Sequence, residues 1–126
     1  MSLHAQSPAH VLVVEDDVIV RASLAEYLEL SGFEVTEADN GDDALGILLA
    51  DLAIDVVFSD VQMPGQLDGL ALARWIRRYR PSTHVLLTSG RIDLASCASD
   101  VCEPASLFAK PYEDASVAQR IHALTH

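Results

Sequence analysis

Basic residues are scarce in this sequence, and their scarcity excludes some classes of protein. The 126 residues include 8 Lys and Arg against 19 Asp and Glu, which gives a formal net charge of −11. Because phosphate contacts require clustered Lys and Arg, we expect no direct binding of nucleic acid. The one basic cluster is interrupted by apolar residues and is typical of the polar side of a helix; it comprises Arg74, Arg77, Arg78 and Arg80.

Cysteine is also scarce, and long apolar runs are absent from the sequence. The spacing of the two cysteines, Cys97 and Cys102, matches no metal or redox motif, so we expect small, partly buried side chains in a reducing cytoplasm. The five histidines are scattered along the chain, with His122 and His126 near its end, and we expect no zinc site. No apolar run approaches the roughly 20 residues of a membrane helix, and the polar start has no secretory hydrophobic region. We therefore expect a cytoplasmic protein that does not bind membranes.

What the sequence does contain is enough apolar residues for one core. Half of the residues are hydrophobic, and a chain of this length fits a single domain. We expect residues 9–126 to form that domain. Residues 1–8 are expected to be a disordered segment or one added for expression.

Strand-like and helix-like patterns alternate along the chain. The pattern predicts strands over residues 10–15, 33–38, 54–60, 84–90 and 106–111, and helices over 17–30, 44–50, 70–80, 92–101 and 113–124. Three of the strands are apolar on both faces, as in parallel sheets covered by helices. The pattern therefore predicts a doubly wound α/β fold with a five-stranded parallel sheet, whose ligands lie beyond the carboxyl ends of the strands.

Polar residues follow the predicted strands at these ends, namely Glu15 and Asp16, then Asp60, then Thr88 and Ser89, and finally Lys110. Two carboxylates about 4 Å apart repel by roughly 4 kcal/mol at an effective dielectric of ~20, so the acids need a counter-charge. Carboxylates favour a hard cation such as Mg²⁺. Together with a lysine and a hydroxyl they form a plausible phosphoryl-transfer site with an aspartate nucleophile.

Each residue also has a structural alternative when it is taken singly. Asp17 is a candidate helix N-cap, and Asp60 could be a turn residue. Thr88 and Ser89 could cap the helix that follows, and Lys110 could be solvated. The coincidence of all these residues at successive strand ends favours a functional site.

Four segments resemble the receiver domain of bacterial two-component response regulators: VLVVEDD, FSDVQMPGQLDGLALARWIR, HVLLTSG and AKP. The resemblance implies a flavodoxin-like strand order 2-1-3-4-5 and a phosphoryl-accepting signalling switch. Asp60 would take a phosphoryl group from a phosphohistidine of a sensor histidine kinase or of a histidine phosphotransfer protein. The implied role is regulatory and not enzymatic, with at most slow autodephosphorylation. A downstream protein or a second copy of the chain is a further candidate partner.

The same resemblance implies roles for the other site residues. Asp16 would be the direct Mg²⁺ ligand, Glu15 would act through water, and the Gln62 backbone carbonyl would be a further ligand. Thr88 would be the switch hydroxyl, and Lys110 would bind the phosphoryl oxygens. A cis peptide bond is expected before Pro111.

One position departs from the family pattern. The family usually has Tyr or Phe three residues before the lysine, where this chain has Leu107, and Phe108 comes next. Adjacent side chains on a strand face opposite sides, so Phe108 cannot simply take that role. The usual coupling between the threonine and the aromatic residue is therefore in doubt, and we expect signalling movements to involve the weak helix 92–101.

Trp75 stands apart from the predicted core of its helix. With Leu70, Ala73 and Ile76 as the core stripe, it falls to one side, near Leu72 and Tyr79. Packing on the surface is one interpretation, and a docking patch for a partner is the other.

Three other functions have to be weighed. A small phosphatase of the haloacid dehalogenase type needs a D-x-D pattern on the first strand, which Glu15-Asp16-Asp17 lacks. A flavodoxin needs a Ser/Thr/Gly-rich loop after that strand, where three acids would repel phosphate. A degenerate receiver that acts only as an interaction module would not need the intact set of acids, Thr88 and Lys110.

Overall fold

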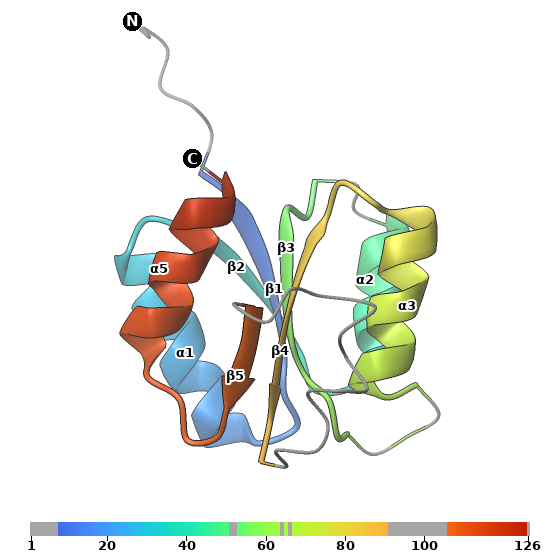
Figure 1. Ribbon diagram of the computed structural model, residues 1–126, viewed down its shortest axis with the longest axis horizontal. Helices are drawn as coiled ribbons and strands as arrows, with labels where there is room; N and C mark the ends of the chain where they lie inside the picture. Colours follow the sequence, from blue (N-terminus) through green and yellow to red (C-terminus); the bar gives the residue numbers. More distant parts are fainter. Residues whose placement is uncertain (1–7, 51–52, 64, 66, 91–105, 126) are drawn as a thin grey trace, which may run out of the picture.

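The computed structural model describes residues 8–50, 53–63, 65, 67–90 and 106–125. Five parallel strands form one sheet in the order β2-β1-β3-β4-β5 (Figure 1). They are β1 (His10–Val14), β2 (Glu34–Ala38), β3 (Val56–Asp60), β4 (His84–Ser89) and β5 (Leu107–Ala109). Both the predicted fold class and the strand order are confirmed.

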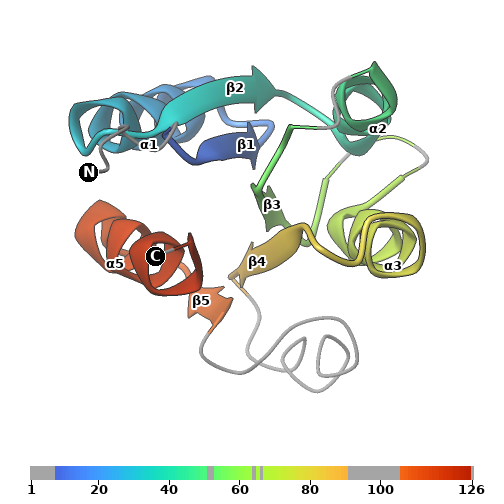
Figure 2. The same cartoon turned by 90° about the horizontal axis from the view of Figure 1, so that it is seen from above.

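Helices cover both faces of this sheet. Four helices lie in the described residues: α1 (Val18–Leu30), α2 (Gly41–Ala50), α3 (Gly69–Tyr79) and α5 (Asp114–Thr125). α1 and α5 pack on one face, and α2 and α3 pack on the other (Figure 2). The predicted helix 92–101, with Cys97 and Cys102, lies outside the described residues.

The alternation of side chains along each strand divides the core between the two faces. Val11, Val13 and Phe58 pack under α1 and α5, together with Leu24 and Ile121 from those helices. The residues that alternate with them, such as Leu12, Val14 and Val57, pack under α2 and α3. The central strands are buried on both faces, which explains their continuous apolar sequences.

Polar residues cap the first two helices. The Asp17 side chain accepts from the backbone N–H groups of Ile19 and Val20, which confirms that Asp17 is the N-cap of α1. Asn40 accepts from the N–H of Asp43 at 2.7 Å, so α2 begins at residue 41, three residues earlier than predicted.

The buried face of α3 is wider than predicted. Ala73 and Ile76 are buried as expected, but Leu72 is buried as well, whereas Leu70 is half-buried at the edge of the core. A helix that covers two strands buries a broad stripe. Trp75 is half-buried against the same core with its ring 5.4 Å from that of Tyr79, which supports surface packing.

Candidate functional site

The parallel sheet brings the predicted site residues to one edge. Asp60 is the last residue of β3, and Thr88 lies opposite it in register on β4. Glu15 directly follows β1, and Lys110 directly follows β5. All five strands point in the same direction, so these residues meet at the lower edge of the sheet in Figure 1.

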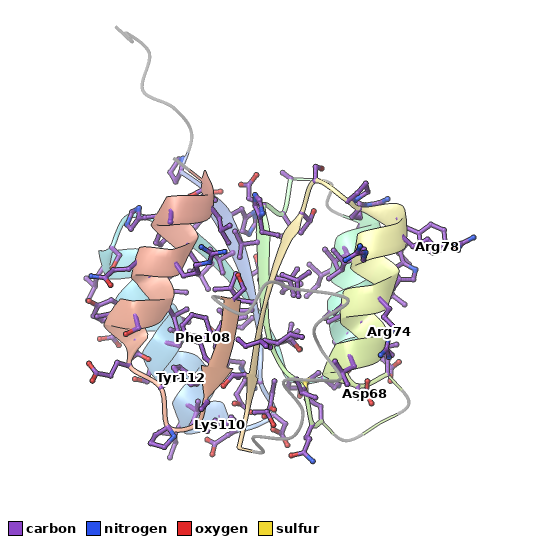
Figure 3. The ribbon with its side chains drawn as sticks, viewed as in Figure 1. Asp68, Arg74, Arg78, Phe108, Lys110 and Tyr112 are labelled. Carbon is purple, nitrogen blue, oxygen red and sulfur yellow. The ribbon has the colours of Figure 1, made fainter. Side chains whose placement is uncertain are left out.

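Lys110 is the centre of the site. Its Nζ donates to Asp60 Oδ2 at 2.6 Å and to Glu15 Oε1 at 3.1 Å. Both carboxylates are buried, with 5% and 1% of the residue exposed, whereas one third of the lysine side chain reaches solvent. Figure 3 shows Lys110 at this edge, below Tyr112 and Phe108. Two buried acids from the ends of different strands therefore share one ammonium group. Lys110 is the only lysine in the chain.

Backbone groups hold the remaining carboxylate oxygens. The N–H of Gln62 donates to Asp60 Oδ1 at 3.0 Å, and the N–H of Asp17 donates to Glu15 Oε2 at 3.2 Å. These contacts fix both carboxylates relative to the sheet. The Gln62 carbonyl, expected as a metal ligand, stays a prediction.

The acids have the composition of a metal site. Glu15, Asp16 and Asp60 each offer a carboxylate oxygen, and these atoms lie within 4.8 Å of one another. Asp16 is exposed while the other two are buried, so the group is open to solvent on one side. Among the described residues, no other group of three His, Cys, Asp or Glu has this geometry. Hard oxygen ligands of this kind suit Mg²⁺.

The charges of the site perturb one another. Burial raises the pKa of the Glu15 carboxyl, and its hydrogen bond with Asp16 adds to this effect, while the Asp17 N–H and Lys110 oppose it. Burial of the Lys110 ammonium acts to lower its pKa, but the hydrogen bonds to Asp60 and Glu15 outweigh burial and raise the pKa. The lysine is therefore held in its charged form by the two acids.

Thr88 carries a buried hydroxyl that has no hydrogen-bond partner among the described residues. The residue is buried, and its Oγ1 makes no hydrogen bond in the described structure. Burying an unpaired hydroxyl costs about 1–3 kcal/mol, so such groups are rare without a function. An incoming oxygen beside Asp60 would give this hydroxyl its acceptor.

Leu107 and Phe108, which stand three and two residues before Lys110, face opposite sides of the sheet, as predicted. Leu107 packs with the core under α2 and α3, whereas Phe108 packs with the core under α1 and α5. The Phe58 ring has two aromatic neighbours, with ring centroids 6.1 Å from that of Phe108 and 5.3 Å from that of Tyr112. The Lys110–Pro111 peptide bond is cis, which confirms that expectation.

Gly69 allows α3 to begin directly against the site. A Cβ atom at this position would overlap the Asp60 carbonyl and would lie 2.7 Å from the Val61 Cα. The Gly69 N–H donates to the Val61 carbonyl at 3.0 Å, and Asp68 caps the helix. The absence of a side chain at residue 69 therefore lets the helix pack against the end of β3.

One contact of the site, made by Arg21, was not predicted from the sequence. Arg21 on α1 donates through a terminal guanidinium nitrogen to the Glu15 backbone carbonyl at 2.7 Å and through Nε to Glu37 at 3.2 Å. The sequence offered one hint of this contact, because Arg21 is the only Lys or Arg before residue 74.

Comparisons with known proteins agree with this geometry. The family model of the response regulator receiver domain matches residues 11–122. The chain is 37% identical over 103 residues to the C4-dicarboxylate transport transcriptional regulatory protein DctD of Rhizobium meliloti, covering 81% of the chain and 22% of that protein. It is 35% identical over 118 residues to the DNA-binding transcriptional regulator NtrC of Salmonella typhimurium, covering 92% and 25%. The chain thus spans about a quarter of each relative.

Solved structures give the same result. The response regulator TrrA of Thermotoga maritima, in complex with Mg²⁺ and BeF, is 26% identical with a TM-score of 0.81, covering 92% of this chain and 98% of that one. A receiver domain protein from Clostridium thermocellum is 26% identical with a TM-score of 0.82, covering 92% of this chain and 93% of that one.

None of the described helices is long and apolar enough to span a membrane.

Proposed function

The chain belongs to the family of response regulator receiver domains, and on that premise we propose that Asp60 is its phosphoacceptor. The donor is a phosphohistidine of a sensor histidine kinase or of a histidine phosphotransfer protein. The receiver domain is a regulatory domain of two-component signalling, and we place its action in the cytoplasm. The observation that carries the proposal is the Lys110 ammonium on Asp60 Oδ2, with Thr88 opposite Asp60 in register. The Thr88 hydroxyl is buried and has no partner among the described residues.

The reaction is a transfer of a phosphoryl group between two protein side chains. An Asp60 carboxylate oxygen attacks phosphorus, the P–N bond to the histidine breaks, and the imidazole nitrogen keeps the bonding electron pair. Lys110 and Thr88 then donate hydrogen bonds to the phosphoryl oxygens. These donors are placed before the reaction and act where negative charge develops in the transition state.

The carboxylate group fits a Mg²⁺ ion. Asp16 and Asp60 would hold it directly, Glu15 would act through water, and the Gln62 carbonyl would complete the protein ligands. The ion supplies positive charge that offsets the charge on the transferring group. Support comes from the donor set, because among the described residues the lysine ammonium binds only Glu15 and Asp60 of the three clustered carboxylates, which leaves Asp16 without that counter-charge.

Phosphorylation changes which conformer is favoured. A phosphoryl group that binds Thr88 and Lys110 more tightly in one conformer shifts the population toward it. Slow hydrolysis of the acyl phosphate resets the domain, with Gln62 and Gly90 beside the site tuning its lifetime. A downstream protein or a second copy of the chain would read the active conformer.

The test is intact mass measurement after incubation with Mg²⁺ and acetyl phosphate, or with a phosphorylated kinase. We expect one added phosphoryl group on the wild type, none on Asp60→Asn, and none on the wild type in excess EDTA. Asp42→Asn is the matched control, because Asp42 is an exposed aspartate on α2. Equal labelling of Asp60→Asn and the wild type would refute the proposal.

Separate observations distinguish the alternative functions. Steady turnover of a phosphomonoester that depends on Asp16 and not on Asp60 would indicate a phosphatase. A yellow purified protein would indicate a flavodoxin. A receiver that serves only as an interaction module would bind partners without being labelled, but the contacts of Lys110 do not favour it.

A further inference from the structure

We infer that Arg21 is a positioning residue, which holds the peptide between Glu15 and Asp16 in the orientation that Mg²⁺ binding requires. This inference rests on the proposed function. Arg21 touches no carboxylate of the metal group through a hydrogen bond; its partners are the Glu15 backbone carbonyl and the Glu37 side chain. It therefore acts on the backbone that carries two of the three acids.

Arg21 completes the fixation of Glu15 by four separate contacts. The Glu15 N–H donates to the Ala38 carbonyl of β2 at 3.1 Å, and Lys110 and the Asp17 N–H hold the two carboxylate oxygens. The carbonyl is the last polar group of the residue, and Arg21 binds it at 2.7 Å. Without the guanidinium, the peptide plane that leads to Asp16 loses the hydrogen bond that anchors it to α1.

The position of Arg21 in the helix has no other explanation in the described structure. It is the fourth residue of α1, near the helix end whose dipole disfavours a cation. Arg21 forms an ion pair with Glu37, whose side chain is 44% exposed, and ion pairs exposed to solvent contribute little to stability. The arginine side chain itself is only 16% exposed. The contact with the carbonyl accounts for a half-buried cation at an unfavourable helix position.

The geometry requires a residue with two separate donors. One terminal guanidinium nitrogen donates to the Glu15 carbonyl, just after the end of β1, while Nε donates to Glu37 on the edge strand β2. A planar guanidinium can make both contacts at once, whereas a lysine ammonium is a single point of charge. Arg21→Lys therefore keeps the charge and removes the bridge between the two strands.

The direction of the change in Mg²⁺ affinity separates positioning from charge. A nearby cation repels Mg²⁺, so if Arg21 acted only through charge, Arg21→Gln would bind Mg²⁺ more tightly than the wild type, and Arg21→Lys would match the wild type. If Arg21 positions the peptide, both variants bind Mg²⁺ more weakly. We expect a loss of about tenfold for Arg21→Lys, as when groups that orient metal ligands are removed.

The experiment is an NMR titration of the backbone amides of residues 15–17 with Mg²⁺, together with a thermal melt of each variant. Arg78→Lys is the matched control, because Arg78 is an exposed arginine on α3, and its Mg²⁺ affinity should equal that of the wild type. Glu37→Gln weakens only the second anchor of Arg21, so it should lose less affinity than Arg21→Lys. It also tests the inference if Arg21→Lys does not fold.

The outcomes are distinguishable from failure of the proposed function. A wild type that binds no Mg²⁺ would refute the metal site itself. Saturable binding by the wild type with unchanged affinity in Arg21→Lys would refute only the role of Arg21. A lower melting temperature with unchanged Mg²⁺ affinity would show that Arg21 is merely structural and would overturn the inference.

Discussion

Replacing Lys110 by methionine should destabilise the unphosphorylated domain. Lys110 Nζ is the shared partner of Asp60 and Glu15, at 2.6 and 3.1 Å, and both acids are almost fully buried. Removing one partner of a buried ion pair costs about 3–5 kcal/mol. Because one third of the lysine side chain is solvated, we expect about 2 kcal/mol. For a domain of 126 residues, that corresponds to a drop in melting temperature of about 8 °C.

The loss should depend on pH in a definite direction. The pKa of Lys110 is raised in the folded state, so its contribution is fully present below the unfolded value of 10.5 and is lost as the pH rises through the folded pKa. At acidic pH the Glu15 carboxyl, whose pKa burial raises, becomes protonated and no longer needs the ammonium. The stability difference between the wild type and Lys110→Met should therefore be larger near neutral pH than at acidic pH.

Urea denaturation at acidic and neutral pH measures this difference. Arg78→Met is the control, because it removes one positive charge from an exposed position and should change the free energy of unfolding by less than about 0.5 kcal/mol. The reasoning is refuted if Lys110→Met behaves like this control at neutral pH, or if its stability loss is the same at both pH values.

Three further predictions follow from the same site. Gly69→Ala should lower the free energy of unfolding by more than about 2 kcal/mol and slow phosphorylation, because its Cβ would overlap the Asp60 carbonyl. In contrast, the Cβ of Gly46→Ala in α2 would meet no atom within 4 Å, so this variant should stabilise the domain by about 0.5–1 kcal/mol. Urea denaturation of the two variants checks both expectations. Thr88→Val should raise the free energy of unfolding by about 1 kcal/mol, since it removes a buried hydroxyl without a partner, while the amide shifts that follow phosphorylation should shrink; a loss of stability would contradict the assignment. Lys110 is the only lysine, so an NMR titration of its Nζ should give a pKa above 10.5 that falls in Asp60→Asn, and an unchanged value would show that Asp60 does not hold the ammonium.

The sequence predicted the sheet well because its central strands carry an unambiguous signal. Residues 11–14 and 56–58 are apolar without interruption and fully buried between two layers of helices. The edges were less accurate. β5 has only three residues, 107–109, instead of the predicted 106–111, because Pro111 has no N–H with which to continue the ladder. Helix α2 begins at residue 41 and not at the predicted residue 44, because Asn40 caps it and apolar periodicity carries no information about caps.

The candidate site followed from the sequence only as far as strand ends and side-chain chemistry could take it. Residues 15, 60, 88 and 110 converge because parallel strands end at one edge. The contact of Arg21 depends instead on how α1 lies over the edge strand and on a backbone carbonyl, which has no signature in the sequence. The packing of Tyr112 on Phe58 likewise depends on the path of the chain after β5.

The most direct test of the central claim is to locate the phosphoryl group after incubation with Mg²⁺ and acetyl phosphate. Borohydride reduces an aspartyl phosphate to homoserine, and peptide mass spectrometry then identifies the modified residue. We predict homoserine at position 60 and at no other acidic position. Homoserine at position 16, or a stable phosphoryl group on a histidine or serine with residue 60 unchanged, would contradict the account.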